Sequence, residues 1–214
     1  MPVSVKICGV TDAEHATTAA RNGARWLGFV FFEKSPRHLS IDAATKLRPK
    51  LPRNIERVGV FVDAEMDYME QAINALDLDW VQLHGDEYPT DAQMIKNRFG
   101  VSVIKAIGVR TKDDIERAQA FAPYVDAILF DAKPPIGADL PGGNALSFPW
   151  KLLQGMTLTV PWLLAGGLTA NNLAEAIAAS GATAADVSSG VEDAPGIKSS
   201  SKIEAFLRAA KAVT

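Results

Sequence analysis

Residues 162–190 read WLLAGGLTANNLAEAIAASGATAADVSSG, and they contain one complete repeat of the fold together with the start of the next. The apolar run Trp162–Ala165 predicts a short buried strand. A helix is expected to follow Thr169 and to stop at Gly181, because glycine tolerates the left-handed conformation that ends helices. A second apolar run, Ala184–Val187, predicts the next strand. Strands that alternate with helices in this way form a parallel sheet.

The same alternation extends over the rest of the chain. Six further apolar runs predict strands at Val3–Ile7, Trp26–Phe32, Val58–Val62, Trp80–Leu83, Val101–Ala106 and Val125–Phe130. Helix starts are expected at three stretches with capping-box spacing, and helix ends at two further glycines. These positions are Thr11–Glu14, Thr111–Asp114 and Ser201–Glu204 for the starts, and Gly23 and Gly100 for the ends.

Eight strand–helix units account for all 214 residues. They predict an α/β fold of the closed (β/α)₈ TIM-barrel type, with eight parallel strands, an outer ring of helices and a single domain over residues 1–214. The doubly wound open sheet is the structural alternative. A loop at 132–147 carries three Pro and three Gly, and we expect it to serve function, as long irregular loops in compact domains often do.

Composition excludes several classes of protein. The formal charge of −3 argues against a nucleic-acid binder that relies on bulk positive charge. A single Cys excludes a disulfide framework and any multi-cysteine metal site, and it fits a cytoplasmic protein. We expect no metal, since the three His residues lack ligand spacing. We also expect no signal peptide and no membrane span, because no apolar run approaches the ~18 residues that a span requires.

Two loops at the predicted rim are candidates for binding phosphate. In a barrel the active site lies at the carboxyl ends of the strands, often with a phosphate between the seventh and eighth loops. Gly166 and Gly167 follow the seventh strand, while Ser188, Ser189 and Gly190 follow the eighth. Such residues let backbone amides approach an anion closely. The alternative is that the glycines only form tight turns.

Two rim residues are candidates for acid–base chemistry. Cys8 ends the first strand, and Asp131 follows the sixth. A lone Cys is more often a small buried hydrophobe, and an Asp before a Pro-containing loop is more often turn chemistry. At a barrel rim, however, the thiol needs only a modest fall in pKa to act as a base. Partial burial of the carboxyl would raise its pKa and suit it to act as a general acid.

Three other side chains at the predicted rim carry alternatives. Arg37 is either a solvated surface residue or a bidentate clamp for a carboxylate. His84, after the fourth strand, could serve as a general base. Lys105, within the fifth strand, could form a Schiff base if it were desolvated.

The sequence resembles the phosphoribosylanthranilate isomerase family along its whole length. Seven motifs in order at the predicted strand ends are similar to those of the family, and their order is more specific than any one of them. They are Lys6–Gly9, Gly28–Phe31 leading into Ser35–Arg37, Gln82–Glu87, Leu129–Asp131, Ala165–Leu168, Asp186–Glu192 and Pro195–Lys198.

The resemblance implies a cytoplasmic enzyme of tryptophan biosynthesis. Its reaction is the Amadori rearrangement of N-(5-phosphoribosyl)anthranilate to 1-(2-carboxyphenylamino)-1-deoxyribulose 5-phosphate. An aldose–ketose shift needs one acid and one base, so no cofactor is expected, and monomer and homodimer are both compatible. By this resemblance Cys8 is the base and Asp131 the acid. Substrate contacts fall to Arg37, Gln82 and His84, and phosphate contacts to Gly166, Gly167, Ser188, Ser189 and Gly190.

Two rival functions remain open on the sequence. One is another phosphate-binding barrel enzyme, such as a Schiff-base lyase that uses Lys105. The other is a phosphate-ligand binder that has kept the barrel without turnover. Cys8 and Asp131 discriminate between these readings, because binding alone requires neither a base nor an acid.

Overall fold

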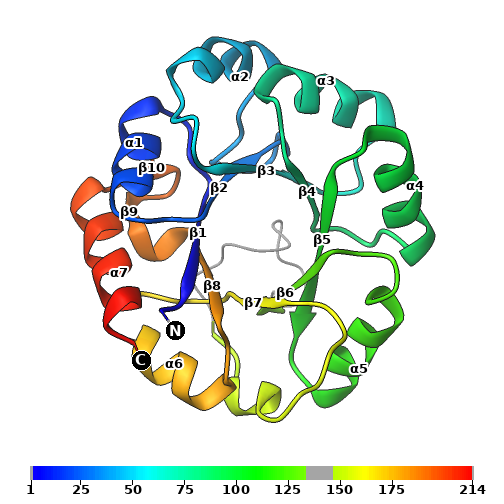
Figure 1. The fold of residues 1–214 in the computed structure, drawn as a ribbon, viewed down its shortest axis with the longest axis vertical. Helices are drawn as coiled ribbons and strands as arrows, with labels where there is room; N and C mark the ends of the chain where they lie inside the picture. Colours follow the sequence, from blue (N-terminus) through cyan, green and yellow to red (C-terminus); the bar gives the residue numbers. More distant parts are fainter. Residues whose placement is uncertain (1, 134–146, 214) are drawn as a thin grey trace.

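Eight parallel strands close into a barrel in a computed structural model that describes residues 2–133 and 147–213 (Figure 1). Each strand pairs with its sequence neighbour, and β1 pairs with β8, which excludes the open sheet. The TIM-barrel prediction is therefore confirmed. The strands are β1 (Ser4–Cys8), β2 (Trp26–Val30), β3 (Glu56–Phe61), β4 (Trp80–Leu83), β5 (Ser102–Val109), β6 (Ala127–Ala132), β7 (Trp162–Leu164) and β8 (Ala184–Val187).

The helices surround the barrel in Figure 1 and cover its outer face. They are α1 (Ala13–Arg21), α2 (Ile41–Leu47), α3 (Met66–Leu76), α4 (Pro89–Phe99), α5 (Lys112–Phe121), α6 (Leu173–Ser180) and α7 (Ser200–Ala212), with short 3₁₀ turns η1 (Arg48–Lys50), η2 (Trp150–Leu153) and η3 (Ser189–Val191). No helix among the described residues is long and apolar enough to cross a membrane.

The sixth unit departs from the expected strand–helix pattern. Within the described residues, only the 3₁₀ turn η2 lies between β6 and β7. Most of the loop singled out at 132–147 lies outside the part of the chain that the structure describes, so its expected role stays a prediction.

The observed helix caps can be compared with the three capping boxes that the sequence predicted. The box at Thr111 is confirmed, with its side chain and that of Asp114 capping reciprocally. The boxes expected at Thr11 and Ser201 are wrong. Asp12 caps α1 instead, accepting from the backbone N of His15 at 2.9 Å, and α7 is preceded by Ser199. Successive Ser, Thr and Asp residues are all good caps, so the pattern alone does not decide which one is used.

The glycine stops are confirmed. Gly100 and Gly181 adopt left-handed conformations, with φ of 67° and 78°, directly after α4 and α6. Gly23, with φ of 91°, follows one residue beyond the cap of α1.

Apolar side chains pack in two layers, as alternation along each strand requires. Trp26, Val58 and Leu129 belong to the cluster that fills the barrel interior. Ile7 and Leu27 belong to the larger cluster between the strands and the helices. Because Ile7 points outward to the helices, its neighbours in β1, Lys6 and Cys8, point into the barrel.

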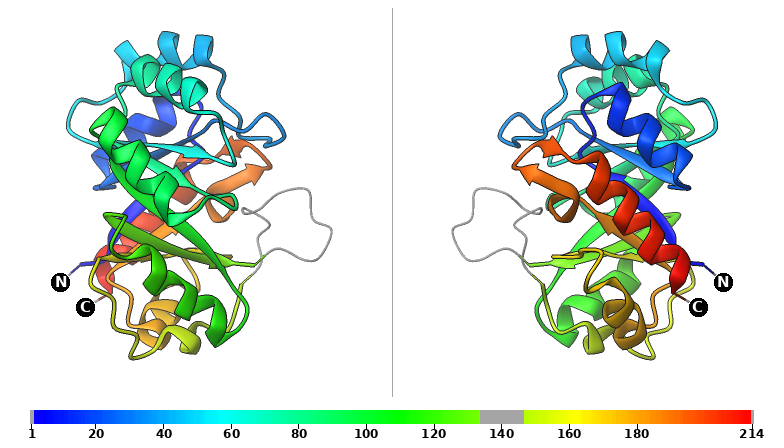
Figure 2. Two further views of the ribbon diagram at one scale, coloured as in Figure 1. Left: turned by 90° about the vertical axis from the view of Figure 1, so that its right-hand side faces the viewer. Right: turned by 90° about the vertical axis from the view of Figure 1, so that its left-hand side faces the viewer.

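A hairpin that the sequence did not predict follows β8. It consists of β9 (Glu192–Ala194) and β10 (Ile197–Lys198), paired antiparallel. In both views of Figure 2 the orange hairpin lies beside the blue loop that follows β2. A Cβ on Gly196 would lie 2.3 Å from the Pro36 carbonyl oxygen, so the hairpin and this loop are in close contact.

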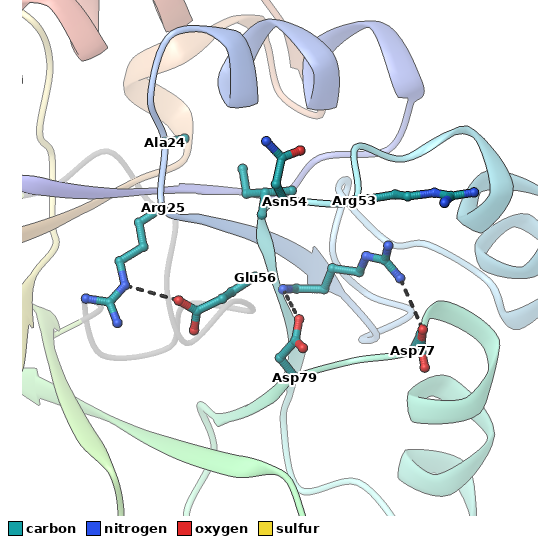
Figure 3. Close-up of a pocket in the computed structure, with 9 residues that line it drawn as sticks. Ala24, Arg25, Arg53, Asn54, Glu56, Asp77 and Asp79 are labelled. Atoms are coloured by element: carbon teal, nitrogen blue, oxygen red, sulfur yellow. Dashed lines mark hydrogen bonds and ion pairs between the residues drawn. The ribbon is translucent and has the colours of Figure 1, made fainter.

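The opposite end of the barrel carries a polar cavity of about 430 Å³ where β2, β3 and β4 begin (Figure 3). Its charges are largely paired with one another. Arg25 Nε lies 3.2 Å from Glu56 Oε1, and the backbone N of Arg57 donates to Asp79 at 2.8 Å. Glu56 also accepts from the Trp80 indole at 2.5 Å. These contacts tie the three strand starts together, as expected of the stabilising face of a barrel.

Candidate active site

Cys8 is the last residue of β1 and lies buried at the carboxyl end of the barrel, with 7% of its surface exposed. It pairs in register with Gly28 of β2, where a Cβ would lie 2.9 Å from the sulfur. Glycine at position 28 therefore leaves room for the thiol. Burial raises the pKa of Cys8, the Lys6 and Lys198 ammonium groups oppose that rise, and the Asp186 carboxylate adds to it.

A buried ion pair lies beside this thiol. Lys6 is fully buried, and its Nζ donates to Asp186 Oδ1 at 2.8 Å across the pairing of β1 with β8. Burial would lower the pKa of Lys6, but the Asp186 carboxylate and Cys8 together outweigh burial and raise the pKa above its ordinary value. Lys6 therefore remains a cation inside the barrel.

Asp131 lies within β6 and not after it, because the pairing of β5 with β6 continues to Val109 and Ala132. Its side chain is buried, and its two carboxyl oxygens have different neighbours. Oδ1 accepts from the backbone N of Ala132 at 2.8 Å, and Oδ2 lies 3.6 Å from His84 Nε2. A Cβ on Gly166 would lie 3.2 Å from Oδ1, so the loop after β7 reaches this carboxyl only because residue 166 is glycine.

Gln82 and His84 form a polar row that ends at Asp131. Gln82 Nε2 lies 3.0 Å from His84 Nδ1, and the buried Gln82 Oε1 accepts no hydrogen bond from the described residues. When the amide nitrogen donates to Nδ1, the imidazole carries its proton on Nε2, which faces Asp131. The structure thus brings together three residues that the sequence predicted separately.

Arg37 is not a solvated surface residue, since only 5% of it is exposed. It forms the expected bidentate geometry, but with a carboxylate of the protein itself. Nε lies 2.7 Å from Glu192 Oε1, and Nη2 lies 2.8 Å from Oε2. A Cβ on Gly9 would lie 2.6 Å from Arg37 Cδ, so the stem of Arg37 packs against the backbone that follows Cys8.

Glu192 is shared by two cations. Lys198 Nζ donates to Glu192 Oε1 at 2.6 Å, and it also lies 3.0 Å from the Ser188 carbonyl oxygen. Burial would raise the pKa of Glu192, but Arg37 and Lys198 outweigh burial and hold that pKa below its usual range. Burial lowers the pKa of Lys198, and Glu192 offsets this only in part. The hairpin therefore ties Arg37 to the loop after β8.

The loop after β7 contains two left-handed glycines, Gly166 with φ of 89° and Gly167 with φ of 64°. Asn172 holds the loop by accepting from the backbone N of Thr169 at 2.8 Å and donating to the Gly167 carbonyl at 2.9 Å. The helix expected to follow Thr169 begins later than predicted, with Asn172 and not Thr169 at its cap position. Residues 170–172 form a turn, and α6 begins at Leu173.

The loop after β8 lies against the loop after β7. A Cβ on Gly190 would lie 1.9 Å from the Leu168 carbonyl oxygen, so any larger residue would force the two loops apart. Ser188 Oγ lies 3.3 Å from Lys198 Nζ, and Ser189 begins the 3₁₀ turn η3. The residues predicted to bind phosphate thus meet at one place on the rim.

Lys105 has partners that do not suit a nucleophilic amine. Its Nζ donates to Glu87 Oε2 and to the Gly85 carbonyl, each at 2.7 Å, and its side chain is 4% exposed. A Schiff base requires a neutral amine, and a carboxylate partner favours the ammonium form.

Comparison with known proteins decides the family. Residues 5–209 match the family model described as N-(5'-phosphoribosyl)anthranilate (PRA) isomerase. The chain belongs to this isomerase family. A curated isomerase of this name from Paramagnetospirillum magneticum is 47% identical over 99% of this chain and 98% of the relative.

Solved structures of isomerases agree with that assignment. The phosphoribosyl anthranilate isomerase of Thermotoga maritima is 38% identical, with a TM-score of 0.87 and 98% of each chain covered. A second structure, at 36% identity, a TM-score of 0.82 and the same coverage, is an isomerase in complex with reduced 1-(o-carboxyphenylamino)-1-deoxyribulose 5-phosphate. The resemblance stated from the motifs is confirmed, and the lyase and the non-catalytic binder are set aside.

Four charged residues of this isomerase site were missed as functional candidates: Lys6, Asp186, Glu192 and Lys198. Lys6 carried a signal, since it stands two residues before Cys8 and must share its face of the strand. Asp186 carried a similar signal as a carboxylate inside an otherwise apolar strand. The pairing of Glu192 with Arg37 had none, because the two lie 155 residues apart.

Proposed function

We propose that this chain isomerises N-(5'-phosphoribosyl)anthranilate to 1-(2-carboxyphenylamino)-1-deoxyribulose 5-phosphate, with Asp131 as general acid and Cys8 as general base. One observation carries the proposal. A buried carboxyl on β6 and a buried thiol on β1 stand at the same end of the barrel, with β7 and β8 between them in the order of the strands. The reaction is a step of tryptophan biosynthesis.

Asp131 opens the sugar ring in this proposal. It gives its proton to the furanose oxygen while the bond from that oxygen to C1' breaks, and the anthranilate nitrogen lone pair forms an iminium. The backbone N of Ala132 holds Oδ1, so Oδ2 is the oxygen that delivers the proton. His84, 3.6 Å away and aligned by Gln82, keeps Oδ2 turned toward the substrate. Positioned acids of this kind contribute about 10²–10⁴-fold.

Cys8 completes the rearrangement. Its thiolate removes the proton from C2', and the electrons of that C–H bond neutralise the iminium to give an enolamine. The enolamine then tautomerises to the ketone as C1' gains a proton. C2' is oxidised and C1' is reduced within one molecule, so the balance needs no external oxidant or reductant.

The two anionic ends of the substrate are bound by separate groups in this proposal. Backbone amides of Gly166, Gly167, Ser188, Ser189 and Gly190 take the phosphate. Arg37 takes the anthranilate carboxylate while Glu192 fixes its guanidinium plane. The chain carries a net charge of −3, so attraction of a substrate with two anionic groups must be local.

We further propose that the protein works in the cytoplasm as a single domain over residues 1–214, as a monomer or a homodimer. The phosphoribosylanthranilate isomerase of Thermotoga maritima is described as dimeric, in a structure of monomers generated from it. Gel filtration with light scattering distinguishes the two states.

The activity is tested by a coupled turnover assay in which the substrate is made in situ from anthranilate and phosphoribosyl pyrophosphate. We expect steady turnover without added metal or cofactor. Absence of turnover would contradict the proposal. So would a covalent adduct at Lys105 after borohydride reduction with a carbonyl substrate, since no step above forms a Schiff base.

A further inference from the structure

The pair formed by Lys6 and Asp186 has no place in the steps above, yet it lies inside the barrel next to the proposed base. Lys6 is fully buried, and a lysine in such a place costs stability unless it has a partner. Its hydrogen bond to Asp186 Oδ1, at 2.8 Å, supplies that partner. An apolar pair would fill the same space at lower cost. The charges at this position therefore call for a functional reason.

Geometry connects this pair to Cys8. A Cβ on Gly28 would lie 3.0 Å from Lys6 Nζ and 2.9 Å from Cys8 Sγ, so nitrogen and sulfur both lie close to the same point. They are separated by less than about 6 Å, a range over which an opposite charge acts strongly on ionisation. Glycine at position 28 keeps this space free of a side chain.

Other charged groups act on the thiol as well. Lys198 of β10 also favours the thiolate, whereas Asp186 of β8 disfavours it. Lys198 is itself bound to Glu192, which is also the partner of Arg37. The neighbouring residue of β2, Gly28, brings no charge. Of the two cations, Lys6 acts more strongly on the thiol, and its carboxylate partner favours its charged form.

We propose that Lys6, held in place by Asp186, is the counter-ion that stabilises the thiolate form of Cys8 and is thus a positioning residue of the isomerisation. The proposal deepens the proposed function and rests on it, because it concerns the base of that reaction. Burial disfavours the thiolate, and a fixed cation in a dry site opposes that effect. Lys6 exchanges no proton with the substrate.

The test is a pH titration of the thiolate, followed by its ultraviolet absorbance, with Cys8→Ser as the blank. Cys8 is the sole cysteine of the chain, so the signal has one source. We expect Lys6→Met to raise the midpoint by at least about one pH unit, and kcat to fall at least about tenfold at neutral pH. In Lys6→Met the unpaired Asp186 adds to the rise.

The double variant Lys6→Met/Asp186→Asn keeps the proposal falsifiable if the single variant fails to fold, because removal of both partners leaves no buried charge behind. Its midpoint should lie between those of the wild type and Lys6→Met. Lys105→Met is a matched control, since it also removes a buried, ion-paired lysine from a barrel strand. Its thiolate midpoint should equal that of the wild type.

A Lys6→Met midpoint equal to that of the wild type would overturn the proposal, and so would a double-variant midpoint above that of Lys6→Met. Failure of the proposed function has a different signature. If Cys8→Ser turns over substrate normally while the thiolate midpoints of the other variants keep the expected order, Lys6 still controls the ionisation of Cys8. In that case Cys8 is not the base.

Discussion

The thiol of β1 and the carboxyl of β6 are both buried at the same end of the barrel, but their surroundings differ in kind. Cys8 is surrounded by fixed charges, with Lys6 and Lys198 opposing Asp186. Asp131 is held by a backbone amide and an imidazole, at 2.8 and 3.6 Å. A base that must carry a negative charge is stabilised by buried cations. The proposed acid instead has a backbone amide and an imidazole beside its two oxygens, and these contacts fix its direction.

Asp131→Asn removes the proposed general acid. An amide keeps the shape and the contact with the Ala132 amide but has no proton of suitable acidity, so ring opening loses its acid. We expect kcat to fall by at least about 10²-fold, while the reduced product analogue still binds. The coupled turnover assay and a binding titration measure the two effects. Turnover close to that of the wild type would remove Asp131 from its role.

Arg37→Ala tests the residue whose stem packs against the backbone that follows Cys8. This change leaves the buried Glu192 with Lys198 as a charged partner and the backbone N of Gly196 as a further donor, and it removes the proposed clamp for the anthranilate carboxylate. We expect KM to rise on the order of tenfold to a hundredfold, with a smaller change in kcat.

The same substitution breaks a buried ion pair, so the free energy of unfolding should fall by about 3–5 kcal/mol. Denaturant titration measures that loss, and the kinetics are read under conditions where the variant is folded. An unchanged KM would show that Arg37 does not touch the substrate.

A third carboxyl on the same rim, that of Asp114, has a structural role and contrasts with the proposed acid. Asp114 accepts from the backbone N of Arg110 and Thr111 and pairs with Lys133. Burial opposes this, but these donors lower the pKa of Asp114 to about 2. A lowered carboxyl pKa contributes stability that is complete above the ordinary pKa and is lost as the pH falls through about 2.

Asp114→Asn should therefore lower the free energy of unfolding by up to about 2 kcal/mol at neutral pH, and by less as the pH is lowered below about 4. Thermal or denaturant unfolding over this pH range measures the effect. A loss of stability that is independent of pH would mean that the charge of Asp114 is not what stabilises the loop.

The fold was largely predictable because each strand is a short apolar run bounded by turn residues. β4 and β8 begin and end at the predicted residues, and the remaining strands shift by a few positions. β6 extends through Asp131 because β5 supplies hydrogen-bonding partners up to Val109. That extension depends on the neighbouring strand and leaves no mark in the local sequence.

The site was predictable where position on a strand implies position on the rim. Cys8 and Asp131 follow from that rule, as do the glycine loops. The partners of these residues do not follow from it. Arg37 finds Glu192 only because the hairpin after β8 folds over the loop after β2, and no local pattern in either segment records that contact.

One measurement tests directly whether Cys8 is the general base. The turnover of Cys8→Ser is measured beside its affinity for the reduced product analogue. A serine hydroxyl fills the space but does not ionise near neutral pH. The account predicts that kcat falls by at least about 10²-fold, with the affinity within about threefold of the wild type. Turnover within about threefold of the wild type would contradict it.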